Sequence, residues 1–318
     1  MENKIRGIHH VTAITADAQD NVDFYCGVLG LRLVKLTVNF DAPTSYHLYY
    51  GDGVGSPGTV LTFFVWAGAY RGQVGPPQVT SVAFAVPEGA LEFWAERLRQ
   101  HQVQVEEIGD RFGESVLGFD DPDGVRIELV AAGSPMAGSG PVEPGRAIQG
   151  FHSVTLSEEG YEKTAKHLTD VFGFQAEAQT GKRFRYRSGS GEHGSVLDVL
   201  CLPDAPLARL GGGVVHHVAF RTPDDAQQAV WRGTLCDLGY NVTPVIDRQY
   251  FHSIYFREPG GVLFEIATDG PGFAIDEPAD ELGKKLMLPP WLEPLRGKLE
   301  RILPQVQVPD WPGAVLSV

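Results

Sequence analysis

Apolar and polar residues alternate along four short segments of the chain, at intervals of about 70 residues. Alternation with a period of two residues is typical of a β-strand that buries one face. The four segments begin at Ile8, Val79, Phe151 and Val215 and read IHHVTAIT, VTSVAFAV, FHSVTLSE and VHHVAFRT. We therefore expect a strand at the start of each of four similar units.

Each of these segments is followed by a helix-like stretch and then by another apolar strand. The helix-like stretches are Ala18–Leu29, Glu88–His101, Tyr161–Phe172 and Asp224–Leu238, and the closing strands are GTVLTFFVW, GVRIELVAA, GSVLDVLCL and GVLFEIATD. This order predicts one βαβββ unit used four times. Because such a unit cannot bury its own sheet face, the units must pair. The predicted fold is α+β, with four βαβββ modules in two paired-module domains.

Two positions in the aligned units carry residues that are able to bind a metal ion. The first position holds His10, Ser81, Ser153 and His217, and the second, about 45 to 52 residues later, holds Thr62, Glu128, Asp198 and Glu265. Strand alternation directs both positions to one concave face. Pairing of the first unit with the fourth unites His10, His217 and Glu265, with Thr62 in the fourth place. The other pairings supply one imidazole at most.

Two histidines and one carboxylate are the facial triad that holds Fe(II) and leaves coordination positions open. A single strand histidine is more often a hydrogen-bonded core residue, but the repeated placement and the partner Glu265 favour metal ligands. Glu265 lies in the apolar strand LFEIA, where an unpaired carboxylate would be costly. For Glu128 we expect a surface acid or a pair with an arginine such as Arg126, and for the RFRYR run, Arg183–Arg187, an exposed strand face.

The chain resembles the vicinal oxygen chelate superfamily, whose members pair βαβββ modules. The stretch HHVTAITADAQDNVDFYCGVLGLRLVKLTVNFDAPTSYHLYYGD is similar to hydroquinone-type ring-cleaving dioxygenases of that superfamily, and so is the end of the chain, from GGVLFEIATDGPGF to GKKLMLPPWLEPLR. The resemblance places iron ligands at His10, His217 and Glu265. It places the pocket residues of the family at His9, Thr12, His216, Arg248 and Tyr255.

The resemblance implies O₂-dependent cleavage of a hydroquinone-type ring by an enzyme of the non-haem iron extradiol type. Tyr255 and Arg248 would then stabilise a bound oxyanion, and His9 or His216 would move protons. Enzymes that cleave catechols take one iron ligand from the third module, where this chain has Ser153. They also keep a histidine in the region of Arg248, so the change favours a hydroquinone.

Two other functions fit the same fold. A glyoxalase-like metal-dependent lyase or transferase needs no O₂, but such sites usually carry a second carboxylate where Thr62 stands here. A non-catalytic protein that binds an aromatic ligand would need no triad. Fold alone does not distinguish these functions.

Composition narrows the setting in which the protein works. The formal charge of −14 argues against nucleic acid, since phosphate binding needs clustered Lys and Arg. No apolar run is long enough to cross a membrane, and MENKIRGI does not resemble a secretion signal. The three cysteines are too scattered for a disulfide framework. We expect a cytoplasmic homo-oligomer that meets a small aromatic substrate and O₂.

The repeat also predicts the domain organisation. Residues 1–135 would hold the first and second modules and residues 150–270 the third and fourth. The Gly- and Pro-rich stretch Ala132–Gln149 would link these halves. Residues 271–318 would wrap the body or cover the pocket, with a short helix near Leu295–Ile302.

Overall fold

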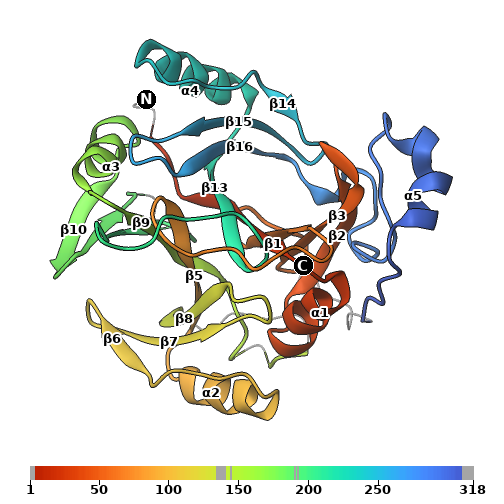
Figure 1. Ribbon diagram of the computed structural model, residues 1–318, viewed down its shortest axis with the longest axis horizontal. Coiled ribbons are helices and arrows are strands. Elements are labelled where there is room, and N and C mark those ends of the chain that lie inside the picture. Colours follow the sequence, from red (N-terminus) through yellow and green to blue (C-terminus); the bar gives the residue numbers. More distant parts are fainter. Residues whose placement is uncertain (1–3, 134–140, 144, 190, 192, 310–318) are drawn as a thin grey trace.

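Two curled eight-stranded sheets form the body of the protein, and the helices lie at its periphery (Figure 1). The computed structural model describes residues 4–133, 141–143, 145–189, 191 and 193–309. The predicted α+β fold of four repeated units is confirmed. Each described unit runs from a strand through a helix into three further strands, as the repeat predicts.

The first sheet is built from the first and fourth units. In order across the sheet its strands are β14 (Ile246–Asp247), β15 (Phe251–Arg257), β16 (Leu263–Pro271), β13 (Val214–Thr222), β1 (Ile8–Thr15), β4 (Val60–Val65), β3 (Ala42–Gly51) and β2 (Arg32–Asn39). The opening strands β1 and β13 are antiparallel neighbours at its centre. The closing strands β4 and β16 flank them and run parallel to them.

The second sheet repeats this arrangement with the second and third units. Its strands are, in order, β10 (Gln175–Thr180), β11 (Arg183–Arg187), β12 (Val196–Cys201), β9 (Gly150–Glu158), β5 (Gln78–Pro87), β8 (Arg126–Gly133), β7 (Glu114–Asp120) and β6 (Gly109–Arg111). The central pair is now β5 and β9. Each sheet therefore draws one unit from either half of the sequence.

The predicted helices lie close to their expected positions. The α-helices are α1 (Ala18–Val22), α2 (Leu91–Gln100), α3 (Glu162–Lys166), α4 (Asp225–Asp237) and α5 (Arg296–Ile302). In the first and third units the helix continues as a π-helical turn, η1 (Asp23–Val28) and η2 (His167–Val171). The amide of Leu29, for example, bonds the carbonyl of Phe24, five residues back. No described helix is long and apolar enough to cross a bilayer.

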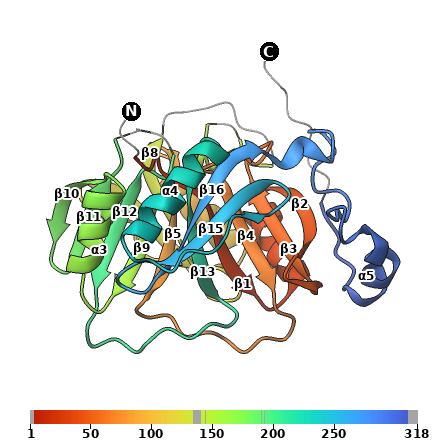
Figure 2. The same cartoon turned by 90° about the horizontal axis from the view of Figure 1, so that it is seen from above.

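The central strands are buried on both faces, which is how they can carry the site. All eight residues of β1 are buried. Its apolar side chains, such as Val11, pack into a core that continues into the second sheet, and β13 lies against β5 (Figure 2). The histidines of β1 therefore have little access to bulk water.

The chain after β16 packs along the first unit. Leu286 forms an isolated bridge with Leu36 on β2, and the ring of Trp291 meets Phe40 edge-on. The fully buried ammonium of Lys35 contacts Asp276 at 2.6 Å and also Glu277. The predicted helix near the end of this segment is α5, whereas residues 310–318, like 134–140 of the predicted linker, lie outside the described residues.

Candidate metal centre

Three neighbouring strands bring His10, His217 and Glu265 together. The parallel pairing of β13 with β16 sets Ala219 beside Glu265, and the antiparallel pairing of β1 with β13 sets Thr12 beside His217. The Nε2 atoms of His10 and His217 lie 3.3 Å and 2.9 Å from Oε2 of Glu265. One ligand atom from each residue falls within 4.8 Å of the others, so a single ion could contact all three.

The state of these three groups fits a metal ion. Oε2 of Glu265 and Nε2 of His217 are buried. Although they lie 2.9 Å apart, neither has a hydrogen-bond partner among the described residues. Burial raises the pKa of Glu265, but the two imidazoles outweigh it and hold that pKa well below its usual value. Burial lowers the pKa of His217. A carboxylate and a neutral imidazole are the protonation states that bind metals.

The histidine that precedes each candidate ligand in the sequence makes a hydrogen bond to the ligand's ring. Nδ1 of His9 lies 2.9 Å from Nδ1 of His10, and Nδ1 of His216 lies 2.8 Å from Nδ1 of His217. A hydrogen bond at Nδ1 fixes the ring so that Nε2 faces the ion. Burial lowers the pKa of His9, and it lowers that of His216 to about 3. The geometry gives both an orienting role, whereas proton transfer by them stays a prediction.

Arg248 and Tyr255 form the wall of the site on the fourth unit. Nε of Arg248 donates to the hydroxyl of Tyr255 at 3.2 Å, and the guanidinium lies over the tyrosine ring. Nη1 of Arg248 also reaches Asp41, in the turn between β2 and β3, at 2.9 Å. Burial raises the pKa of Tyr255, so its proton is retained at neutral pH.

The site opens on a narrow cavity of about 20 Å³. Its lining residues are His10, Thr12, Asn39, Phe40, His47, Tyr49, Phe64, His217, Arg248, Phe251 and Tyr255. A cavity of this size has room for about one water molecule. An aromatic molecule would have to displace side chains at the rim, where Phe40 and the Arg248–Asp41 pair lie.

His47 and Tyr49 also reach this cavity, from β3, although neither was predicted as a site residue from the sequence. Tyr49 pairs with Thr62 in the sheet register just as Tyr255 pairs with Glu265, so the two tyrosines are equivalent in the repeat. His47, two residues earlier on the same face, is the equivalent of Ser253. A third aligned position in the repeat would have revealed them.

The second sheet neutralises its aligned carboxylates with arginine. Arg111 on β6 holds both oxygens of Glu128 at 2.6 Å and 2.7 Å, and Arg185 on β11 holds both oxygens of Asp198 at 2.8 Å and 3.2 Å. Of the two expectations for Glu128, the surface acid was wrong, because Glu128 is buried. The pairing with an arginine is confirmed, but the partner is Arg111, and Arg126 pairs with Glu106 instead. The RFRYR strand is likewise not simply exposed, since Arg185 is buried.

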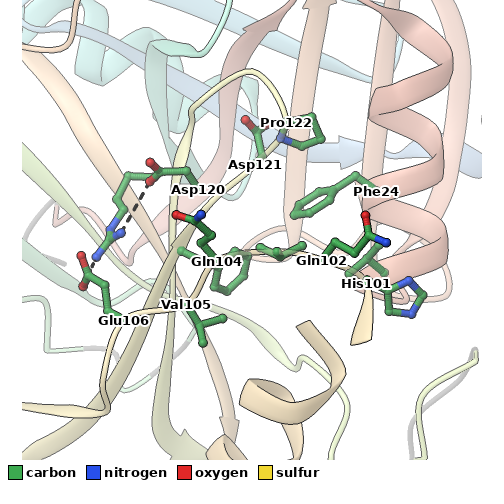
Figure 3. A pocket seen from close by; sticks show the side chains of 13 residues that line it. Phe24, His101, Gln102, Gln104, Val105, Glu106, Asp120, Asp121 and Pro122 are labelled. Carbon is green, nitrogen blue, oxygen red and sulfur yellow. Dashed lines mark hydrogen bonds and ion pairs between the residues drawn. The ribbon is translucent and has the colours of Figure 1, made fainter. Parts of the chain in front are cut away.

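A wider cavity of about 640 Å³ lies away from the triad, beside the C-terminal end of α2 (Figure 3). Phe24, Phe119 and the segment from His101 to Glu106 line it. The charged groups that it displays are already paired, as Arg126 bonds Asp120 at 3.5 Å and also contacts Glu106 (Figure 3). Nothing at this cavity offers chemistry comparable to the triad.

The repeat, the pairing of units and the triad together define a family. The sequence matches the Glyoxalase/Bleomycin resistance protein/Dioxygenase superfamily over residues 7–129 and 150–266. The chain belongs to this superfamily, which confirms the resemblance seen in the sequence.

Individual relatives are similar over nearly the whole chain. A Bacillus subtilis (strain 168) protein named "Putative ring-cleaving dioxygenase MhqO" is 48% identical over 304 residues, covering 95% of this chain and 96% of the relative. The "Chlorohydroquinone/hydroquinone 1,2-dioxygenase" of Sphingobium indicum is 37% identical over 315 residues, covering 95% and 97%.

Two solved structures are also similar to this chain. The crystal structure of a Bacillus subtilis protein titled "putative dioxygenase" superposes with a TM-score of 0.93 at 47% identity, covering 97% of this chain and 100% of that one. Glyoxalase I from Zea mays superposes with a TM-score of 0.63 at 16% identity, covering 83% and 92%. The second likeness shows the shared fold alone.

Proposed function

We propose that the protein is an Fe(II)-dependent ring-cleaving dioxygenase of the extradiol type that uses O₂ to open hydroquinone-type aromatic rings. The observation that carries this proposal is the buried cluster of His10, His217 and Glu265. Two imidazoles and one carboxylate match the ligand preference of non-haem Fe(II). The dioxygenase names of relatives that cover nearly the whole chain support the reaction class.

The protein's own residues would orient the reactants and exclude water. His10, His217 and Glu265 would hold the ion, which when bound would supply the one-electron chemistry that joins an aromatic ring to O₂. The rings of Phe251 and Phe64 lie against His10 and His217 and cover the ligands with apolar surface. A dry site strengthens the hydrogen bonds within it.

Arg248 and Tyr255 would hold the substrate oxygen that lies far from the metal. A catechol can offer a metal two adjacent oxygens, whereas a para-diol can offer one, so its other hydroxyl has to bind the protein. The guanidinium of Arg248 keeps donors in addition to those used by Tyr255 and Asp41. A charge-assisted hydrogen bond of this kind contributes about 1.5–3 kcal/mol.

The glyoxalase-like alternative has less support from the geometry. A glyoxalase-like site usually has a second carboxylate as its fourth ligand. In this protein Thr62 occupies that place and hydrogen-bonds both His47 and Thr12 at 2.8 Å. A lyase of this kind would also act without O₂.

Oxygen uptake is the deciding experiment. Protein reconstituted with Fe(II) under anaerobic conditions is mixed with oxygenated hydroquinone or catechol, and O₂ consumption and ring-opened product are followed. We expect hydroquinones to exceed the matching catechols in kcat/KM and the metal-free protein to be inactive. Absence of O₂ uptake with every aromatic diol would overturn the proposal.

A further inference from the structure

Four side chains form an unbroken hydrogen-bonded chain that ends at the cavity. The hydroxyl of Tyr49 lies 2.8 Å from Nδ1 of His47, and Nε2 of His47 lies 2.8 Å from the hydroxyl of Thr62. The hydroxyl of Thr62 lies in turn 2.8 Å from that of Thr12. Tyr49 and His47 come from β3, Thr62 from β4 and Thr12 from β1, one residue after Val11 and two after the candidate ligand His10.

The geometry fixes the direction in which these groups donate. The hydroxyl of Thr62 donates to Thr12, so its oxygen is left to accept from Nε2–H of His47. The imidazole is neutral, because burial and the nearby histidines lower its pKa well below the ordinary value. With hydrogen on Nε2, Nδ1 can only accept, and the hydroxyl of Tyr49 supplies that hydrogen bond.

This direction leaves one hydrogen unassigned, that of the Thr12 hydroxyl. Thr12 is fully buried and lines the cavity, and no acceptor for its hydrogen is seen among the described residues. Its oxygen already accepts from Thr62, so its hydrogen has to point elsewhere. The open direction is the cavity, which it shares with His10 and His217.

The residues equivalent to His47 and Thr62 have a different role in the fourth unit. There Ser253, the equivalent of His47, donates to Glu265, the equivalent of Thr62. In the fourth unit the strand pair thus orients an acceptor that can bind a metal, whereas in the first unit it orients a row of donors.

We propose that Tyr49 and His47 are positioning residues that hold the hydroxyl of Thr12 as a preset donor to an oxygen of the bound aromatic substrate. The identity of that substrate rests on the proposed function, but the chain of donors does not. Such a donor loses little orientational freedom on binding, because Thr62 already fixes it. It would act from the first unit, whereas Arg248 and Tyr255 line the same cavity from the fourth.

The first test is the tautomer of His47 in the metal-free protein. Nitrogen NMR of ¹⁵N-histidine-labelled protein distinguishes a ring that carries hydrogen on Nε2 from one that carries it on Nδ1, and His47→Gln identifies the signal. We expect the Nε2–H form. An Nδ1–H ring would reverse the chain and overturn the proposal, whatever substrate the enzyme uses.

The second test measures binding without turnover. Hydroquinone is titrated under anaerobic conditions into Zn(II)-loaded protein, because zinc has no redox chemistry. We expect Thr12→Val and Thr62→Val each to weaken binding by about 2- to 10-fold, the contribution of one neutral hydrogen bond. Thr12→Ser and Thr62→Ser, which keep the hydroxyl, should bind as the parent does.

A double variant separates one donor chain from two independent contacts. If Thr62 acts only through Thr12, the Thr12→Val/Thr62→Val variant should bind no more weakly than Thr12→Val alone. Additive losses, or a Thr62→Val variant with unchanged affinity, would contradict the proposal. Failure of the dioxygenase assay with both tests positive would instead reject the proposed reaction and leave the positioning chain standing.

Discussion

Glu265 is the residue on which the candidate site depends. It is fully buried, and it lies against two imidazoles and no cationic side chain among the described residues. A buried carboxylate without a cation is costly. A metal ion held by His10, His217 and Glu265 would offset that cost with its positive charge.

We predict that Glu265→Gln loses the bound metal while the matched variant Glu128→Gln keeps it. A neutral amide in place of the Glu265 carboxylate would carry no charge to balance the ion, whereas Glu128 already forms its ion pair with Arg111 in the other sheet. Metal content per chain, measured by elemental analysis on folded protein, provides the test. Full metal content in Glu265→Gln would exclude the triad.

A second prediction concerns Arg248. We expect Arg248→Ala to lower turnover on a hydroquinone by at least about tenfold without releasing metal, because a charge-assisted hydrogen bond to the substrate is lost. Asp41→Asn is the control, since Asp41 is exposed and its pair with Arg248 should contribute little. Steady-state oxygen uptake compares them, and an unchanged rate in Arg248→Ala would remove this residue from the site.

The sequence was sufficient for residues whose positions repeat along the chain. His10, His217 and Glu265 lie at the opening and closing strands of their units, and these strands are recognisable by their alternation. His47 and Tyr49 lie on β3, whose register against β4 depends on the turns between the strands, and alternation alone does not fix that register. The donor chain therefore became visible only with the structure.

At the level of elements, the two sheets share one architecture, but the side chains at their aligned positions have different roles. In the first sheet the aligned positions supply the candidate metal site. In the second sheet, Arg111 from β6 and Arg185 from β11 close over Glu128 and Asp198. The sequence did not reveal these pairs, because short strands such as β6 carry no periodic signal and the partners lie on different strands.

We expect Arg111→Ala to destabilise the protein by about 3 kcal/mol, because it leaves the buried carboxylate of Glu128 unpaired. Arg126→Ala is the matched control, since its partners Glu106 and Asp120 are exposed, and it should cost less than about 1 kcal/mol. Urea unfolding at pH 7 measures both. Equal effects of the two variants would show that the pair of Arg111 and Glu128 in the second sheet is exposed to solvent.

At the scale of the whole molecule, two buried acids join the sheets. Glu158 ends β9 of the second sheet, and Glu258 follows β15 of the first. Glu258 accepts from Thr164 and from the amide of Gly260, both at 2.8 Å. A Cβ atom at position 260 would lie only 1.9 Å from an oxygen of Glu158, so the two acids can approach each other because this residue is glycine.

The carboxyl group of Glu158 is buried beside that of Glu258, and this makes the contact between the sheets sensitive to pH. Burial and the neighbouring Glu258 raise the pKa of Glu158 to about 9. In the unfolded chain the same group loses its proton near its ordinary pKa of about 4.3. Between these values the folded state holds one more proton than the unfolded state, so rising pH favours unfolding.

We therefore predict that the free energy of unfolding falls as pH rises from about 5 to about 9, by up to about 1.4 kcal/mol per pH unit from this pair. Glu158→Gln, which keeps the hydrogen bond without a titrating proton, should flatten that slope and be more stable than the parent protein at pH 8. The exposed neighbour serves as control, and Glu159→Gln should leave the slope unchanged. Urea unfolding of the three proteins across this pH range measures the effect, and parallel curves for Glu158→Gln and the parent would show that Glu158 is not the source of the slope.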